Sequence, residues 1–175
     1  GLIDDIKSLS PFKRLLVQVA ISIFIAESGL NIKEINLAWI NMESIYLSHY
    51  LSTLITTFWI VGLINALNWI DGVDGLASGI SGFAALGFTI ISYQNGQSYV
   101  PIIAASISGC SFGFLRFNFY PARMLMGDSG SYFLGFSLAI ISILSTSLES
   151  NPIGIFIPIF LLIIPLVDMV IVILN

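Results

Sequence analysis

Charged residues are scarce in this sequence. Asp, Glu, Lys and Arg make up only 9% of its 175 residues, whereas roughly 25% is usual in a soluble domain. Six basic residues are too few for a nucleic-acid-binding patch, so we exclude nucleic acid as a partner. The single cysteine, Cys110, excludes an internal disulfide bond. With 57% hydrophobic residues and a mean hydropathy of +0.97, the chain is predicted to be an integral membrane protein.

Long apolar stretches dominate the rest of the chain. Six of them have the length to cross a bilayer, which takes about 20 mostly apolar residues in a helix. They cover residues 15–30, 45–67, 76–93, 98–115, 130–148 and 153–174. The sequence therefore predicts an all-α fold, a polytopic transmembrane helix bundle of about six spans, in a single integral membrane domain over residues 1–175. Because the chain begins with Gly1 and shows no signal peptide, we expect an internal fragment of a longer protein.

The basic residues are distributed unequally between the two ends of these spans. If the spans alternate in direction, one side receives most of them: Lys7, Lys13, Arg14, Arg116 and Arg123. Only Lys33 falls on the other side. The positive-inside rule makes the first side cytoplasmic.

Three aspartate motifs gather on this cytoplasmic side. They are Asp4-Asp5, residues 68–75 with Asn68, Asp71 and Asp74, and residues 126–130 with Asp128. Carboxylates in or beside a bilayer are costly, and by default they mark a functional site. Several carboxylates on one side of a membrane are typical of a site that binds a divalent metal together with phosphate groups. The alternative for the second motif is a helix-capping turn, but a cap requires one Asp rather than an Asn and two Asp.

The surroundings of Asp128 suggest the binding of an anion. We expect Asp128 to cap the fifth span while also binding a metal, and the N–H groups of a helix N-terminus favour a diphosphate. Upstream of it, Arg116, Asn118 and Arg123 supply donors for phosphate or nucleotide, although the arginines would equally serve as snorkelling anchors. Asp168 lies inside the last stretch, where Pro165 is expected to kink the helix. Its role stays open between a structural and a site-lining one.

The motifs together resemble the polyprenyl-phosphate N-acetylhexosamine-1-phosphate transferase family, of the glycosyltransferase 4 type. The resemblance covers residues 1–5, 68–77 and 118–136, and residues 165–168 are similar to a fourth motif. It implies a multi-pass enzyme of the bacterial plasma membrane with a cytoplasmic active site. Such an enzyme moves a sugar-1-phosphate from a UDP-sugar to undecaprenyl phosphate, releases UMP, and needs Mg²⁺, or Mn²⁺ in its place. A homodimer is compatible with it.

The resemblance also assigns roles residue by residue. Asp128 would be the principal metal ligand, with Asn68 or Asp71 beside it. Asp4 or Asp5 would deprotonate or position the lipid phosphate, and Asp71 would share in catalysis. Asp74, Asn118, Arg116 and Arg123 would bind the nucleotide substrate, the first two at its uridine end.

The chain departs from the family pattern at several points. Ser8 stands where a third acid is frequent, Leu125 stands where a Phe is frequent, and Met169 replaces a common Thr. The earlier membrane helices and a later His-rich cytoplasmic loop are also missing, so we expect the fragment alone to be inactive.

Residues 117–122 and 129–136 favour one branch of the family. That branch uses UDP-N-acetylglucosamine and starts surface polymers such as O-antigen or teichoic acid. The alternatives are the phospho-MurNAc-pentapeptide transferase of peptidoglycan synthesis, a membrane transporter that carries cations past its aspartates, and an inactive scaffold.

Overall fold

The computed structural model describes residues 10–36, 43–146 and 156–174. Within these ranges the chain is almost entirely helical, which confirms the all-α class. The helices and strands follow one another as α2 (Pro11–Glu27), β1 (Glu34–Ile35), β2 (Ile45–Tyr46), α3 (His49–Ile70), α4 (Leu76–Gln94), α5 (Val100–Asn118), α6 (Gly127–Thr146), α7 (Phe156–Leu161) and α8 (Ile163–Leu174). The antiparallel pair β1–β2 was not predicted, and it closes the loop between α2 and α3.

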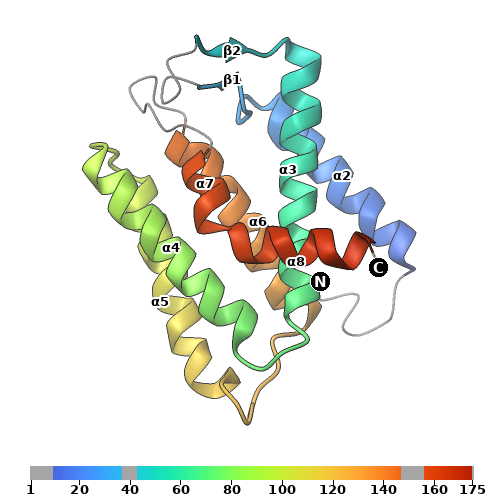
Figure 1. Ribbon diagram of the computed structural model, residues 1–175, viewed down its shortest axis with the longest axis vertical. Helices are drawn as coiled ribbons and strands as arrows, with labels where there is room; N and C mark the ends of the chain where they lie inside the picture. Colours follow the sequence, from blue (N-terminus) through green and yellow to red (C-terminus); the bar gives the residue numbers. More distant parts are fainter. Residues whose placement is uncertain (1–9, 37–42, 147–155, 175) are drawn as a thin grey trace.

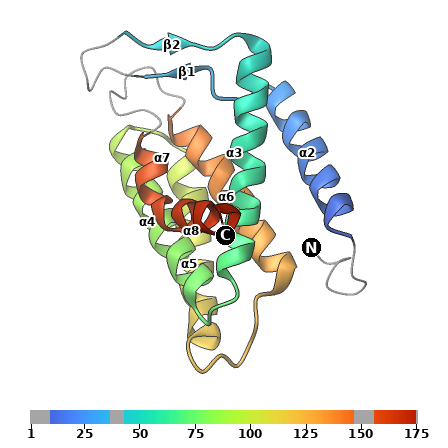
Figure 2. The same ribbon diagram turned by 45° about the vertical axis from the view of Figure 1, so that its right-hand side comes forward.

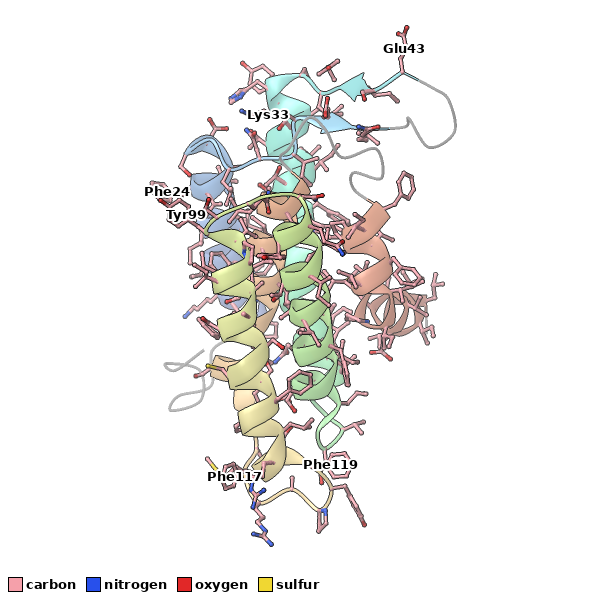
Figure 3. The ribbon with its side chains drawn as sticks, turned by 90° about the vertical axis from the view of Figure 1, so that its left-hand side faces the viewer. Phe24, Lys33, Glu43, Tyr99, Phe117 and Phe119 are labelled. Atoms are coloured by element: carbon pink, nitrogen blue, oxygen red, sulfur yellow. The ribbon has the colours of Figure 1, made fainter. Side chains whose placement is uncertain are left out.

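The helices form a bundle in which α4 packs along α5 and α6 packs along α3 (Figure 1). Figure 2 shows α2 beside α3, on the side away from α4 and α5. The apolar core lies where α3, α4 and α6 meet, around Leu63, Phe88 and Leu138, all of which are fully buried. Lys33 and Glu43 lie at one end of the bundle, and Phe117 and Phe119 lie at the other (Figure 3). The two sides inferred from the sequence are therefore the two ends of the bundle.

The described residues contain four helices that are long and apolar enough to cross a membrane, fewer than the six expected. These four are His49–Ile70, Leu76–Gln94, Val100–Asn118 and Gly127–Ser145. The first expected span is the shorter helix α2, which has 17 residues. The last expected span is not a single helix: it breaks between α7 and α8, and α8 lies across α3 (Figure 1). Pro165 accounts for the break, because it has no N–H to continue the ladder of the preceding helix and is tolerated only in a first helical turn.

Helix α2 turns a narrow stripe of small and polar residues inward and most of its apolar residues outward. Its buried residues are Gln18, Ser22 and Ala26, one per turn. Phe12 and Phe24 on the other face are 68% and 71% exposed. A helix of this kind is attached to the bundle by hydrogen bonds and small-residue packing while its apolar face meets lipid.

The contact between α3 and α6 depends on Gly135. A Cβ atom at this position would lie 2.6 Å from the carbonyl oxygen of Leu63 and 2.7 Å from the Cα atom of Ile64. The two backbones therefore touch, as small residues allow in membrane proteins. Because the helices run antiparallel, this contact brings the end of α3 to the start of α6.

Replacing Gly135 by Ala should force these two helices apart. We expect Gly135→Ala to destabilise the full-length protein by roughly 1–3 kcal/mol, the usual effect of overpacking, measured as a lower midpoint of thermal unfolding in detergent. Gly109→Ala is the matched control, because a Cβ atom at Gly109 on α5 would meet nothing within 4 Å. Equal midpoints for the two variants would contradict this account of the contact.

Candidate functional site

A cluster of polar residues lies where α3 ends and α6 begins. Asn68 is in the last turn of α3, Asp71 is the residue that follows this helix, and Asp128 is in the first turn of α6. The prediction that Asp128 caps α6 is wrong, because this helix begins one residue earlier, at Gly127. A carboxylate in the first turn is still favoured by the partial positive charge of the helix N-terminus.

Both carboxylate oxygens of Asp128 accept hydrogen bonds from other helices. The amide nitrogen of Asn68 donates to Oδ1 at 2.8 Å, and Nη1 of Arg14 donates to Oδ2 at 2.9 Å. The side chains of Arg14 and Asp128 are 28% and 30% exposed, so this ion pair is partly shielded from solvent. Arg14 also donates to the hydroxyl of Tyr132 at 3.2 Å. In the sequence Arg14 indicates only the orientation of the chain, and its contact with Asp128 was not predicted.

The orientation of Asn68 leaves its amide oxygen available to a ligand. Its amide nitrogen donates to Asp128 and also to Oγ of Ser131, at 3.0 Å. With both N–H groups directed toward α6, the carbonyl oxygen is the end that can accept from a ligand or coordinate a cation. Ser131 is fully buried and was not foreseen as part of the site.

Asp71 lies close enough to Asp128 for the negative charge of Asp128 to affect its pKa. Burial, and secondly the negative charge of Asp128, raise the pKa of Asp71 from 3.8 to about 6. Two carboxylates that repel each other next to an amide oxygen form an oxygen-rich, negatively charged site, which is the chemistry that a hard divalent cation requires. Across the described ranges no group of three or more His, Cys, Asp or Glu residues comes together. Two carboxylates and an amide oxygen are a donor set of the kind that Mg²⁺ accepts, since this ion usually retains several waters and takes one or two carboxylates from the protein.

Asn118 and Asp74 connect the two loops on this end of the bundle. Asn118 is only 3% exposed: its Oδ1 accepts from the Gly75 backbone N–H at 3.1 Å and from Oγ of Ser78 at 2.9 Å, while its Nδ2 donates to the Met124 carbonyl at 3.0 Å. Oδ2 of Asp74 accepts from the Ala122 backbone N–H at 3.0 Å.

These bonds pin the loop of residues 119–126 against the start of α4. In this arrangement the amide of Asn118 positions the loop, and a direct contact of Asn118 or Asp74 with uridine stays a prediction. Gly75 itself needs to be glycine, because its φ of +74° lies in the left-handed region.

Arg116 lies just before this same loop, and Arg123 lies within it. Both are exposed, and within the described ranges neither guanidinium makes a hydrogen bond or an ion pair. The loop is anchored at this point, since the backbone N–H of Arg123 donates to the carbonyl of Phe117 at 2.8 Å. The two cations are therefore available to an anionic ligand, but the structure does not join them to the Asp128 cluster.

Three of the predicted residues are not part of the Asp128 cluster as the structure describes it. Asp4 and Asp5 lie outside the described residues, so their expected roles stay predictions. Asp168 is partly buried on α8, and within the described ranges its carboxylate makes no hydrogen bond or ion pair.

A groove of about 390 Å³ opens beside the polar cluster, between α2, α3 and α8. Its polar lining comes from Arg14, Asn65, Asn68 and Tyr132. The remainder of its lining is mostly apolar and includes Leu15, Phe58, Val61, Met169 and Ile173. The groove is therefore amphiphilic, and two of its polar lining residues, Arg14 and Asn68, also bind Asp128.

A family model described as "Glycosyl transferase family 4" matches residues 1–146. A Bacillus subtilis (strain 168) protein named "Probable undecaprenyl-phosphate N-acetylglucosaminyl 1-phosphate transferase" is 34% identical over 168 residues, which are 96% of this chain and 46% of that protein.

Several relatives carry the name "Phospho-N-acetylmuramoyl-pentapeptide-transferase", among them one from Listeria monocytogenes and one from Clostridioides difficile. The one from Listeria monocytogenes serotype 4b (strain CLIP80459) is 42% identical over 78% of this chain and 42% of its own length. The one from Clostridioides difficile (strain 630) is 34% identical over 83% of this chain and 46% of its own length. The chain spans about half the length of the curated relatives it matches. The family model covers most of the chain, and the chain therefore belongs to glycosyl transferase family 4.

Proposed function

We propose that the full-length protein transfers N-acetylglucosamine-1-phosphate from UDP-N-acetylglucosamine to undecaprenyl phosphate and releases UMP. The observation that carries this proposal is the position of the Asp128 cluster beside an amphiphilic groove. An anion-handling site with an adjoining apolar surface suits a substrate that has a phosphate at one end and an isoprenoid chain at the other. The family relatives support the reaction class, since their names describe transferases.

The reaction exchanges one phosphorus–oxygen bond for another. An oxygen of the lipid phosphate forms a bond to the β-phosphorus of the UDP-sugar. The bond from this phosphorus to the oxygen that bridges to the α-phosphorus breaks, and UMP leaves with that oxygen and its electron pair. Positioning and charge stabilisation carry most of the catalysis of phosphoryl transfer.

Asp128, Asp71 and the amide oxygen of Asn68 would hold a divalent cation. When bound, Mg²⁺ or Mn²⁺ would neutralise the charge that develops on the diphosphate. The repulsion between Asp71 and Asp128 supports this assignment, because a cation between two carboxylates relieves it. Asp4 or Asp5 would activate or position the lipid phosphate.

The groove would bind the lipid substrate. We assign the phosphate to the polar lining at Arg14 and Asn68, and the first part of the isoprenoid chain to the apolar lining at Leu15, Val61 and Met169. Burial of the chain would contribute about 25 cal/mol for each Å² removed from water. The nucleotide would lie toward the loop of residues 119–126, where Arg116 and Arg123 supply cations for its phosphates.

The choice of sugar rests on sequence likeness. The relative named for N-acetylglucosaminyl transfer aligns over 96% of this chain, and residues 117–122 and 129–136 favour the same branch. The pentapeptide transferases also match, so transfer of phospho-MurNAc-pentapeptide is the second candidate. We place the site on the cytoplasmic face of a bacterial plasma membrane, at the start of cell-envelope polysaccharide synthesis.

Neutralising Asp128 tests the cation site. We expect Asp128→Asn in the full-length protein to lower kcat by roughly 100-fold or more, since several kcal/mol of charge stabilisation depend on the bound cation. The assay measures UMP release from UDP-N-acetylglucosamine with undecaprenyl phosphate and Mg²⁺.

Glu27→Gln is the matched control for that variant, because Glu27 lies at the other end of α2, where it accepts from Thr53. Full activity in Asp128→Asn would contradict the site. Activity of the wild type with UDP-MurNAc-pentapeptide alone would move the protein to the second candidate, and no release with either sugar would contradict the proposed function.

Filling the groove tests the lipid-binding surface. Gly62 lines the groove, and a Cβ atom there would meet only Sδ of Met169, at 4.0 Å. We expect Gly62→Leu to raise the KM for undecaprenyl phosphate about tenfold, which is the loss of about 1.4 kcal/mol of binding. The KM for the UDP-sugar should stay the same, and Gly109→Leu on the outer face of α5 should change neither. An equal rise in both KM values for Gly62→Leu would contradict the assignment.

A further inference from the structure

Ser131 is a fully buried serine in the second turn of α6 that accepts a hydrogen bond from the Asp128 cluster. Its Oγ lies 3.0 Å from Nδ2 of Asn68, which donates to it. The hydroxyl itself donates to the Gly127 carbonyl at 3.0 Å, with a longer contact to the Asp128 carbonyl at 3.5 Å. A hydroxyl has one hydrogen, and here that hydrogen is directed to the backbone. The lone pairs of Oγ are therefore the part of Ser131 that faces Asn68.

The amide of Asn68 is held in one of its two possible orientations. These orientations exchange the oxygen and the nitrogen, and the hydrogen-bond partners decide between them. Both acceptors, Oδ1 of Asp128 at 2.8 Å and Oγ of Ser131 at 3.0 Å, lie on the nitrogen. The opposite orientation would place the oxygen of Asn68 against the carboxylate of Asp128, where two acceptors repel each other.

This orientation leaves Oδ1 of Asn68 free for a ligand. Both hydrogens of its amide nitrogen are used by α6, and within the described ranges the oxygen makes no hydrogen bond. Asn68 also lines the groove, so the cluster is open on this side. An amide oxygen that is fixed in direction before a cation arrives loses little freedom when it coordinates one.

The two acceptors differ in their own relation to the cation. Asp128 is itself proposed to bind the cation, so its carboxylate has two tasks. Ser131 is neutral and fully buried, and nothing in the proposed function uses its lone pairs. Its bond to Asn68 is therefore the same in the empty and in the occupied site.

Helix packing places Ser131 opposite Asn68. Ser131 lies one turn before Gly135, the residue at which α6 touches the backbone of α3. Further along α6, Ser142 accepts from Nε1 of Trp59 on α3 at 2.8 Å. Residues 131, 135 and 142 thus form a stripe that faces α3. A serine on this stripe has its hydroxyl located by two packed helices rather than by a long, flexible side chain.

Burial alone would not single out Ser131 among the serines of the bundle. Ser81 and Ser92 on α4 and Ser111 on α5 are equally buried, and within the described part of the chain their hydroxyls have no hydrogen-bond partner. Such residues serve packing, because small side chains let membrane helices approach closely. Ser131 differs from them because its hydroxyl contacts a residue of the Asp128 cluster.

We propose that Ser131 is a positioning residue, which holds the amide of Asn68 so that Oδ1 faces a divalent cation bound at Asp128. The inference rests on the proposed function and adds to it a residue that touches neither cation nor substrate. It also explains why an asparagine rather than another aspartate stands at position 68. A carboxylate there would have no N–H to donate to α6 and would add a third negative charge beside Asp71 and Asp128.

The first test measures Mn²⁺ binding to the purified full-length protein by electron paramagnetic resonance, without the UDP-sugar. We expect Ser131→Ala to bind Mn²⁺ about tenfold more weakly than the wild type, the usual effect of removing the partner that orients a metal ligand. Ser145→Ala is the matched control, because Ser145 is a buried serine at the other end of α6 that donates to the Ser142 carbonyl. It should bind Mn²⁺ as the wild type does.

A double-mutant cycle distinguishes positioning from a general structural role. Asn68→Ala alone should weaken Mn²⁺ binding about tenfold or more, because it removes the ligand itself. Adding Ser131→Ala to Asn68→Ala should then change the affinity less than about twofold, since Ser131 acts through Asn68. If Ser131→Ala weakens binding equally with and without the Asn68 side chain, it acts by disturbing the helices, and the positioning role is overturned.

The outcomes separate this inference from the proposed function. If the wild type binds no Mn²⁺, the proposed cation site fails and the role of Ser131 fails with it. If the wild type binds Mn²⁺ and Ser131→Ala binds it as tightly as Ser145→Ala does, the cation site stands and the positioning role is overturned. Wild-type affinity in Asn68→Ala would also overturn it, and this result does not depend on the folding of Ser131→Ala.

Discussion

The close approach of α3 and α6 at Gly135 is the constraint on which the site depends. Without a side chain at this position, the backbones of the two helices touch at Leu63 and Ile64. The antiparallel course of the helices then sets Asn68 and Asp71 beside Asp128, although these residues are some 60 positions apart in the sequence. The chemistry of the site is thus a consequence of helix packing, and a wider spacing of the helices would separate its carboxylates.

Polar residues on the remaining helices complete this arrangement. Helix α2 presents a polar stripe to the bundle and an apolar face outward, so its attachment depends on hydrogen bonds such as that between Gln18 and Asn65. The same packing of α2 places Arg14 within hydrogen-bonding distance of Asp128. Asn118 and Asp74 act in a comparable way at the other loop, where they hold residues 119–126 against the start of α4. In a bilayer the hydrophobic effect does not drive helices together, because lipid tails are as apolar as the helix surfaces. Hydrogen bonds and close packing between helices therefore provide the attachment.

The sequence predicted the helical class and most of the cluster, because both leave local signals. Long apolar runs identify spans, and Asn68, Asp71 and Asp128 stand out as polar residues at their ends. Arg14 left no such signal: its partner is 114 residues away, and only the packing of α2 against α3 and α6 brings the two together. The break between α7 and α8 was foreseen only as a kink at Pro165, since local sequence does not reveal that α8 turns across α3. The burial of Asn118 could not be predicted either, because a sequence motif specifies residue types but not the direction in which a side chain points.

In the function proposed above, Asp71 and Asp128 would hold the cation of a transferase, beside the groove for its lipid. The most direct test is a crystal structure of the full-length protein with Mn²⁺ and UDP-N-acetylglucosamine, in which anomalous scattering locates the metal. We expect an anomalous peak at coordination distance from carboxylate oxygens of Asp128 and Asp71, with the diphosphate beside it. A peak that avoids both aspartates, with the nucleotide bound, would contradict this assignment.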